Sequence, residues 1–210
     1  MAITATRQTR PISRAYMERK VKFKSYDAQR ILRDFARLAF SMYRLGISLR
    51  FFMSDDEVDA LYETVYEELI EPLKKDTADE LQRIEVLCKE NNVAVMEKYS
   101  HPVKRTIRIF MPDAEDMLDL AQSVDTLICR LNDLWFARKI KHRDYLSTKE
   151  KYSKALLETA NRITSLATTT MDKAKAAKEA LEEKQRAQKK TEEQDTDAVP
   201  PLMKVASGIH

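Results

Sequence analysis

Residues 104–112 read Lys104-Arg105-Thr106-Ile107-Arg108-Ile109-Phe110-Met111-Pro112. In this stretch, apolar side chains alternate with long hydrogen-bond donors, a period of two that is typical of a β-strand with one buried face. The inward set is Ile107, Ile109 and Met111, and the outward set is Lys104, Thr106 and Arg108. We therefore predict a strand over 103–111 that ends at Pro112.

A second stretch with the same alternation lies near the N-terminus, at residues 20–25. Its inward positions are Val21 and Phe23, and its outward positions are Lys20, Lys22 and Lys24. Flexible lysines at that spacing suit contacts with phosphates. The sequence alone is equally compatible with a basic N-terminal arm that has no fixed partner.

The strand chemistry points to nucleic acid. A two-stranded ribbon is narrow enough to enter the major groove of B-DNA, where Arg can bind guanine with two hydrogen bonds and Thr can contact a base edge or a thymine methyl group. We predict the following DNA-binding residues: Lys104, Arg105, Thr106, Arg108, Lys20, Lys22 and Lys24. An ordinary hairpin with a solvated face would show the same pattern, and the sequence leaves open which strand, 20–24 or 104–108, enters the groove.

Most of the remaining chain has helical periodicity. An amphipathic helix is expected over 27–45, with a left-handed stop at Gly46. Ser54 and Glu57 have the spacing of a capping box and begin a helix that Pro72 is expected to end. Further expected elements are a helix at 77–90, an extended stretch at 93–96, a helix from Asp113 to about 136, a helix at 147–170 and a solvated helix at 172–198. The apolar seam of the helix after Asp113 fits either a core or a dimer interface.

The scarcity of glycine excludes some classes of fold and function. The chain of 210 residues contains two glycines, where average usage of about 7% would give about 15. Gly-rich dinucleotide and phosphate loops are therefore excluded, and an all-β fold with many tight turns is disfavoured. The expected fold class is mainly α with a short β-ribbon.

Charge is segregated along the sequence. Residues 1–50 carry 12 basic and 3 acidic side chains, whereas residues 51–100 carry 5 basic and 14 acidic ones. The net charge of +3 conceals this asymmetry. It favours a polyanion-binding face, although the two segments could instead pair with each other within one fold or across a dimer.

Catalytic and metal-binding chemistry is poorly supported. No familiar catalytic signature occurs, and the three histidines share no metal spacing with each other or with Cys88 and Cys129. We expect a non-enzymatic protein with no cofactor, no metal and no small-molecule ligand, and with both cysteines buried as free thiols in a reducing cytoplasm. No apolar run approaches the roughly 20 residues of a membrane span, and no secretory signal is expected at the N-terminus.

Three regions are expected: a basic N-terminal arm with a possible strand at 1–26, a helical domain at 27–170 that contains the strand 103–111, and a charged, frayed or disordered tail at 171–210.

Several motifs resemble the AcaB-like transcriptional regulators of conjugative plasmids and integrating conjugative elements. They are Ser100-His101-Pro102, Thr106 to Pro112, Asp113-Ala114-Glu115, Asp125 and Leu134-Trp135, within a resemblance that spans about 25–170. It implies a cytoplasmic, bacterial activator of transfer genes that binds double-stranded DNA as a homodimer through a ribbon-helix-helix element and is nucleoid-associated when bound. A typical element has a short first helix, whereas residues 113–136 form one uninterrupted apolar seam.

The leading expectation is therefore a ribbon-helix-helix-like, DNA-binding dimer with additional helices. The alternative is a helical, non-enzymatic interaction or scaffold protein of a mobile-element transfer system, whose basic and acidic segments contact other proteins.

Overall fold

The computed structural model describes residues 15–95 and 98–196 of the chain. Two strands, β1 (Met17–Phe23) and β2 (Val103–Ile109), form one antiparallel ribbon. The helices are α1 (Tyr26–Gly46), α2 (Asp55–Val65), α3 (Glu71–Glu90), α4 (Pro112–Phe136) and α5 (His142–Thr196). A 3-10 turn, η1 (Ser48–Phe51), precedes α2, and a π-helical turn, η2 (Tyr66–Ile70), joins α2 to α3. The expected fold class, mainly α with a short β-ribbon, is confirmed.

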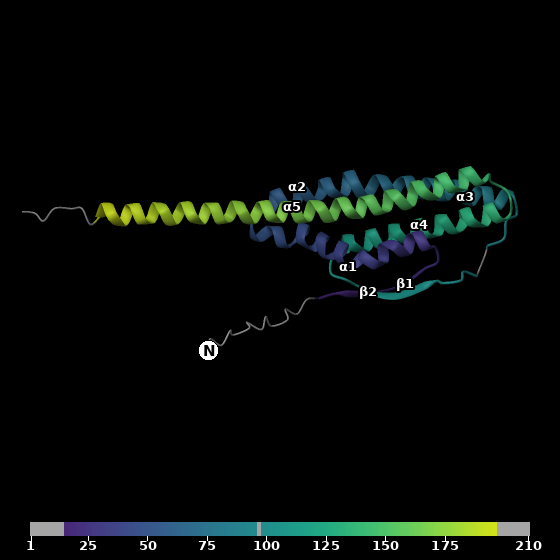
Figure 1. The fold of residues 1–210 in the computed structure, drawn as a ribbon, viewed down its shortest axis with the longest axis horizontal. Helices are drawn as coiled ribbons and strands as arrows, with labels where there is room; N and C mark the ends of the chain where they lie inside the picture. Colours follow the sequence, from purple (N-terminus) through teal and green to yellow (C-terminus); the bar gives the residue numbers. More distant parts are fainter. Residues whose placement is uncertain (1–14, 96–97, 197–210) are drawn as a thin grey trace, which may run out of the picture.

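The helices form an elongated bundle, and the ribbon lies along one side of it beside α1 and α4 (Figure 1). Each of these two helices contacts both strands, while α5 packs on α1 and α4, and α3 packs on α4. Each strand is followed in sequence by one of the two helices that support the ribbon, β1 by α1 and β2 by α4.

The apolar seam of α4 is the centre of the core. Met117, Val124 and Leu127 are fully buried, and Leu131 and Ile128 are nearly so. Of the two interpretations that the sequence allowed for this seam, the structure supports burial within one chain. At the end of α4 the ring of Trp135 stacks on Tyr145 of α5, with centroids 5.0 Å apart, and this contact fixes the turn between the two helices.

Gly46 is the last residue of α1, but the expected left-handed conformation is wrong, because no glycine in the described ranges has a positive φ. The glycine instead lies in close contact with neighbouring side chains. A Cβ atom at this position would lie 2.6 Å from Cε of Met111 and 3.4 Å from a ring carbon of Tyr62. The absence of a side chain at Gly46 therefore leaves space for the side chain of Met111, which lies two residues after the end of β2.

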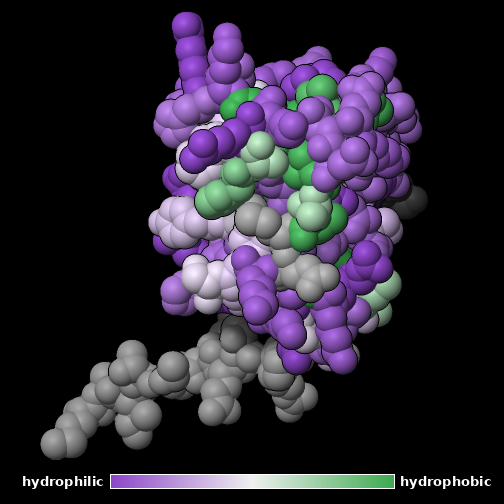
Figure 2. All heavy atoms as spheres, turned by 90° about the vertical axis from the view of Figure 1, so that its right-hand side faces the viewer, coloured by the Kyte–Doolittle hydropathy of each residue, from purple (hydrophilic) through white to green (hydrophobic). Residues whose placement is uncertain are grey.

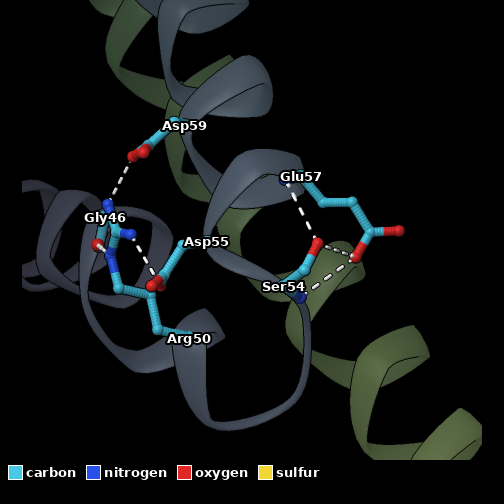
Figure 3. A network of polar contacts seen from close by, with 6 residues as sticks. All are labelled: Gly46, Arg50, Ser54, Asp55, Glu57 and Asp59. Carbon is cyan, nitrogen blue, oxygen red and sulfur yellow. Dashed lines mark hydrogen bonds and ion pairs between the residues drawn. The ribbon is translucent and has the colours of Figure 1, made fainter.

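The capping box that the sequence predicted at the start of α2 is present (Figure 3). The Glu57 amide donates to Oγ of Ser54 at 3.4 Å, and the Ser54 amide donates to the Glu57 carboxylate at 3.0 Å. Beside it, Arg50 donates from Nε to the carbonyl oxygen of Gly46 at 2.9 Å and forms ion pairs with Asp55 and Asp59. Arg50 thus fastens the end of α1 to the first turn of α2.

Pro72 does not end the helix that begins at Asp55, contrary to the expectation from the sequence. The helical path continues through η2 into α3, in which Pro72 lies in the first turn. Proline has no amide hydrogen, and its ring clashes with the carbonyl four residues earlier. The wider π turn immediately before it is the local change that lets the chain continue as a helix.

Several other boundaries differ from the expected ones. Strand β2 ends at Ile109, two residues before the expected end at 111, and α3 begins at Glu71, six residues before the expected 77. Residues 93–95 form no strand, and the rest of the expected stretch at 93–96 lies outside the described ranges. Helix α4 begins at Pro112, and its N-cap is Met111, without a side-chain cap hydrogen bond. Asp113 is therefore a first-turn residue rather than the cap. A carboxylate in the first turn still interacts favourably with the helix dipole.

Helix α5 begins five residues before the expected 147 and continues to Thr196, through much of the region expected to be a charged tail. Its buried positions end at Ala174, and all positions from 175 to 188 are exposed. The helix therefore projects past the rest of the bundle (Figure 1). Residues 1–14 and 197–210, which include parts of the expected arm and tail, lie outside the described ranges.

Seen end-on, the surface of the bundle is mainly hydrophilic, with small hydrophobic areas between the polar side chains (Figure 2). Within residues 15–95 and 98–196, no helix has both the length and the apolar character needed to cross a membrane.

Candidate nucleic-acid interface

The two candidate strands pair with each other in one ribbon. A groove wide enough for the ribbon would therefore receive both strands together. In the register of the ribbon, Lys20 lies opposite Thr106. Side chains of directly opposed residues in an antiparallel pair project to the same face. One face therefore combines residues from both strands, and we call it the outward face: Glu18, Lys20, Lys22, Lys104, Thr106 and Arg108.

All six residues of the outward face are exposed. Four carry a positive charge and one, Glu18, a negative charge. Among the residues that the structure describes, Lys20, Lys22 and Lys104 form no ion pair with a carboxylate. The sequence placed these three lysines on solvent-facing positions, and the register now shows that they lie on the same face as Thr106 and Arg108.

Arg108 contacts two residues of the N-terminal segment, Glu18 of β1 and Tyr16, which directly precedes β1. Its Nε lies 3.6 Å from a carboxylate oxygen of Glu18, and its guanidinium carbon lies 4.9 Å from the centre of the Tyr16 ring. Tyr16 in turn lies 6.0 Å, between ring centroids, from Phe110. The Arg108 side chain is 63% exposed, so the ion pair stabilises the fold by less than about 1 kcal/mol. Its effect is to orient the guanidinium group.

The opposite face of the ribbon anchors it to the helices. Phe23 is completely buried, and Val21 and Ile109 are nearly so. Arg19 shares this face and pairs with carboxylates of α4, at 3.1 Å to Glu115 and 3.3 Å to Asp119. Apolar burial and these ion pairs together fix the ribbon on α1 and α4, so that the outward face is presented by a rigid support.

A buried carboxylate fixes the junction between β1 and α1. The amides of Lys24 and Ser25 donate to the two oxygens of Asp125 at 2.9 and 2.7 Å. The Ser25 hydroxyl oxygen then accepts from the amide of Ala28 at 3.3 Å and caps α1. Asp125 lies on α4, so one side chain joins the end of the first strand, the start of its helix and the helix of the second strand.

Lys24, one of the seven predicted DNA-binding residues, does not lie on the outward face. It follows the last residue of β1, is half-buried, and its Nζ lies 5.6 Å from the centre of the Tyr99 ring. Burial raises the pKa of the Tyr99 hydroxyl, so the ring that Lys24 approaches is a neutral phenol. The Lys24 side chain therefore has an intramolecular contact at the junction.

Arg105 also lies away from the other candidates. It pairs with Val21 in the register and therefore belongs to the helix-facing side. Arg105 is exposed. It borders a groove of about 540 Å³ between α1 and β2 that is also lined by Phe35, Phe40, Thr106 and Arg108. The register thus brings together five of the seven predicted residues, Lys20, Lys22, Lys104, Thr106 and Arg108, and separates Arg105 and Lys24 from them.

Glu18 was missed in the sequence analysis although it lies on the outward face. The alternation of Lys20 and Lys22, extended by two positions toward the N-terminus, identifies Glu18 as an outward residue. Tyr16 was missed for a different reason, because its contact with Arg108 depends on the pairing of two strands that have 79 residues between them in the sequence.

The features typical of a catalytic centre are not assembled around the ribbon. His101 is exposed, and its backbone carbonyl accepts a hydrogen bond from the side-chain amide of Gln29 at 2.9 Å. Within residues 15–95 and 98–196, no three His, Cys, Asp or Glu side chains are grouped so that they could hold a metal ion. Cys88 and Cys129 are both free and buried.

These features define a class of helical protein that presents a basic, two-stranded antiparallel ribbon, with the helix following each strand packed beneath it. No model of a known protein family matches the chain, and no curated protein matches its sequence. A crystal structure of selenomethionine-containing AcaB from uropathogenic E. coli has the same fold, with a TM-score of 0.70 over 79% of this chain and 88% of that one. The chain is AcaB-like, as the sequence resemblance implied, and differs from that AcaB in sequence, with 25% identity.

Proposed function

We propose that the chain binds double-stranded DNA through the outward face of the β1–β2 ribbon and regulates transcription. The observation that carries this proposal is the register, which aligns Lys20, Lys22, Lys104, Thr106 and Arg108 on one exposed face. A ribbon of this width fits the major groove, and its side chains are suited to contact both base edges and phosphates.

The resemblance to AcaB supports the more specific role. We propose a cytoplasmic activator of conjugative-transfer genes in a bacterial host, acting as a homodimer. Mapping the DNA bound by the chain across a host genome that carries a conjugative element, together with reporter transcription from the bound promoters, tests this role. Enrichment at transfer promoters with increased reporter output is the expected result, and light scattering of the purified protein measures its oligomeric state.

The DNA-binding part is tested by fluorescence anisotropy with a labelled random duplex at two salt concentrations. Binding that weakens steeply with salt is expected, because cations that neutralise phosphates release counterions. Replacing Lys20, Lys22 and Lys104 together with alanine is expected to weaken binding to all duplexes alike. Each lost phosphate contact lowers the slope of log affinity against log salt by about 1.

A matched control removes the same number of positive charges from another part of the chain. Lys173, Lys175 and Lys184 are exposed on α5, and their replacement by alanine is expected to leave both affinity and salt slope unchanged. Equal losses for the two triple variants would show that only net charge matters and would refute the ribbon as the interface. Absence of any binding at low salt would refute DNA binding itself.

The second candidate function is a protein-interaction or scaffold role, which the acidic segment favours. Residues 51–100 carry 14 acidic side chains, and those of the first turn of α2, Asp55, Asp56 and Glu57, are exposed. This candidate predicts no salt-dependent binding of duplex DNA, so the anisotropy titration separates the two functions.

A further inference from the structure

The ribbon is complete within a single chain. β1 and β2 pair with each other over seven residues each, and the helix that follows either strand supports both strands. In a ribbon-helix-helix dimer, by contrast, two copies of one sequence each supply one strand, so the two strands of the ribbon are identical. A ribbon formed by one chain has no such restriction.

The two strands differ chemically at equivalent positions. A two-fold axis through the opposed pair Lys20 and Thr106 would relate Lys22 to Arg108 and Glu18 to Lys104. Only the first of these relations matches two side chains of similar charge. The second matches a carboxylate with an ammonium group, and at the centre a lysine corresponds to a threonine. Of the three pairs of positions that the axis would relate, two therefore contain chemically different side chains, and the outward face is asymmetric.

The two ends of the outward face consequently differ. At one end Lys22 lies opposite Lys104, which places two positive charges together. At the other end Arg108 lies opposite Glu18, with 3.6 Å between their charged groups. In the major groove, guanine offers two acceptors to an arginine, and the amino group of cytosine offers a donor to a carboxylate. The Arg108–Glu18 end therefore suits a G·C pair, and the lysine end suits acceptors or phosphates.

We propose that one chain reads a non-palindromic DNA element in a single orientation, with Arg108 and Glu18 at one edge and Lys22 and Lys104 at the other. This inference rests on the proposed function. Lys104 and Arg108 are four residues apart on β2, or about 13 Å at roughly 3.3 Å per residue. That length corresponds to about four base pairs at a rise of roughly 3.4 Å. The two edges of the element are thus about four base pairs apart.

The test selects bound sequences from a pool of short random duplexes with the purified full chain and with three variants. Arg108→Ala and Lys104→Ala each remove one outward cation, and Arg143→Ala removes an exposed cation from the start of α5 as a control. Thermal melting confirms that each variant is folded. The selected sequences show at which base pairs each variant has lost its preference. If a dimer selects two elements in an inverted repeat, each element is analysed separately.

The expected result is an asymmetric element in which Arg108→Ala relaxes the base preference at one edge only. Lys104→Ala relaxes it about four base pairs away or weakens all sequences alike, and Arg143→Ala changes nothing. If Arg108→Ala relaxes both edges of one element symmetrically, the ribbon contains strands from two copies and the inference is overturned while DNA binding stands. Failure to bind any duplex would instead refute the proposed function, and the inference with it.

Discussion

The carboxylate of Asp125 on α4 accepts a hydrogen bond of 2.7 Å from the backbone amide of Ser25, at the point where β1 passes into α1. Its second oxygen accepts from the amide of Lys24 at 2.9 Å. Asp125 is 5% exposed, and its bond with the Ser25 amide is buried, whereas its bond with the Lys24 amide is half-buried. Asp125 therefore links the ribbon to α1 and α4, in addition to the apolar contacts and ion pairs of the helix-facing side.

Asp125→Ala is expected to lower the free energy of unfolding by about 3 kcal/mol, because a buried amide and a half-buried amide lose a charged acceptor. A change of this size lowers the melting temperature by roughly 10 °C in a protein of this length. Thermal unfolding followed by circular dichroism measures it. Asp119→Ala on the same helix is the control, since Asp119 is exposed and its ion pair with Arg19 is expected to contribute less than about 1 kcal/mol. Similar losses for both variants would contradict the role assigned to Asp125.

The sequence predicted the faces of the ribbon better than its pairing. Alternation assigned Val21, Phe23 and Ile109 to the inside, and the structure buries all three. The same alternation applied to β2 assigns Arg105 to the inside, although its charge made it a candidate for DNA binding. The pairing of Lys20 with Thr106 was beyond prediction, because it joins strands separated by 79 residues, Lys24 to Pro102, and depends on how α1 and α4 pack.

The local signals at Pro72 and Gly46 each led to one wrong expectation, the helix end at Pro72 and the left-handed conformation at Gly46. Pro72 is a typical helix terminator, but the apolar residues Leu69 and Ile70 before it are buried in the core, and a π turn keeps them there. Helix α1 ends at Gly46, as the sequence predicted, but without the left-handed conformation, and the absent Cβ leaves space for the Met111 methyl group. In both cases the deciding contact is with a distant part of the chain, which periodicity does not reveal.

Gly46 provides a test of this packing argument. Gly46→Ala is expected to change the free energy of unfolding by less than about 1 kcal/mol, because the gain in helix propensity, up to about 1 kcal/mol, is offset by displacement of the flexible Met111 methyl group. In a Met111→Ala background the obstruction is absent. Adding Gly46→Ala there is expected to stabilise the protein relative to Met111→Ala alone, measured by urea denaturation. Equal effects of Gly46→Ala in both backgrounds would show that the two residues are not coupled.

The two thiols are expected to be unreactive in the folded protein. Burial raises the pKa of Cys129 to about 11 and also raises that of Cys88. A raised pKa means that the thiolate, the reactive form, is scarce below it, and for Cys129 at pH 8 it amounts to about 0.1%. A thiol reagent such as Ellman's reagent is expected to detect neither cysteine in the native protein and both in guanidinium chloride. Rapid reaction of either thiol under native conditions at pH 8 would show that it is accessible.

Arg105 and Arg108 are the matched pair that tests the face assignment. They lie three residues apart on β2 and carry the same charge, but the register places Arg108 on the outward face and Arg105 on the helix-facing side. Arg108→Ala is expected to weaken binding to the selected DNA element by about 1–3 kcal/mol, or roughly 5- to 150-fold, and to relax base preference. Arg105→Ala is expected to change affinity by less than about twofold, because the register places its side chain on the opposite side of the ribbon from the outward face. Anisotropy titrations with the selected and a scrambled duplex measure both effects. A loss of specificity with Arg105→Ala but not with Arg108→Ala would mean that the ribbon meets DNA with its other face, which requires the ribbon to lift from α1.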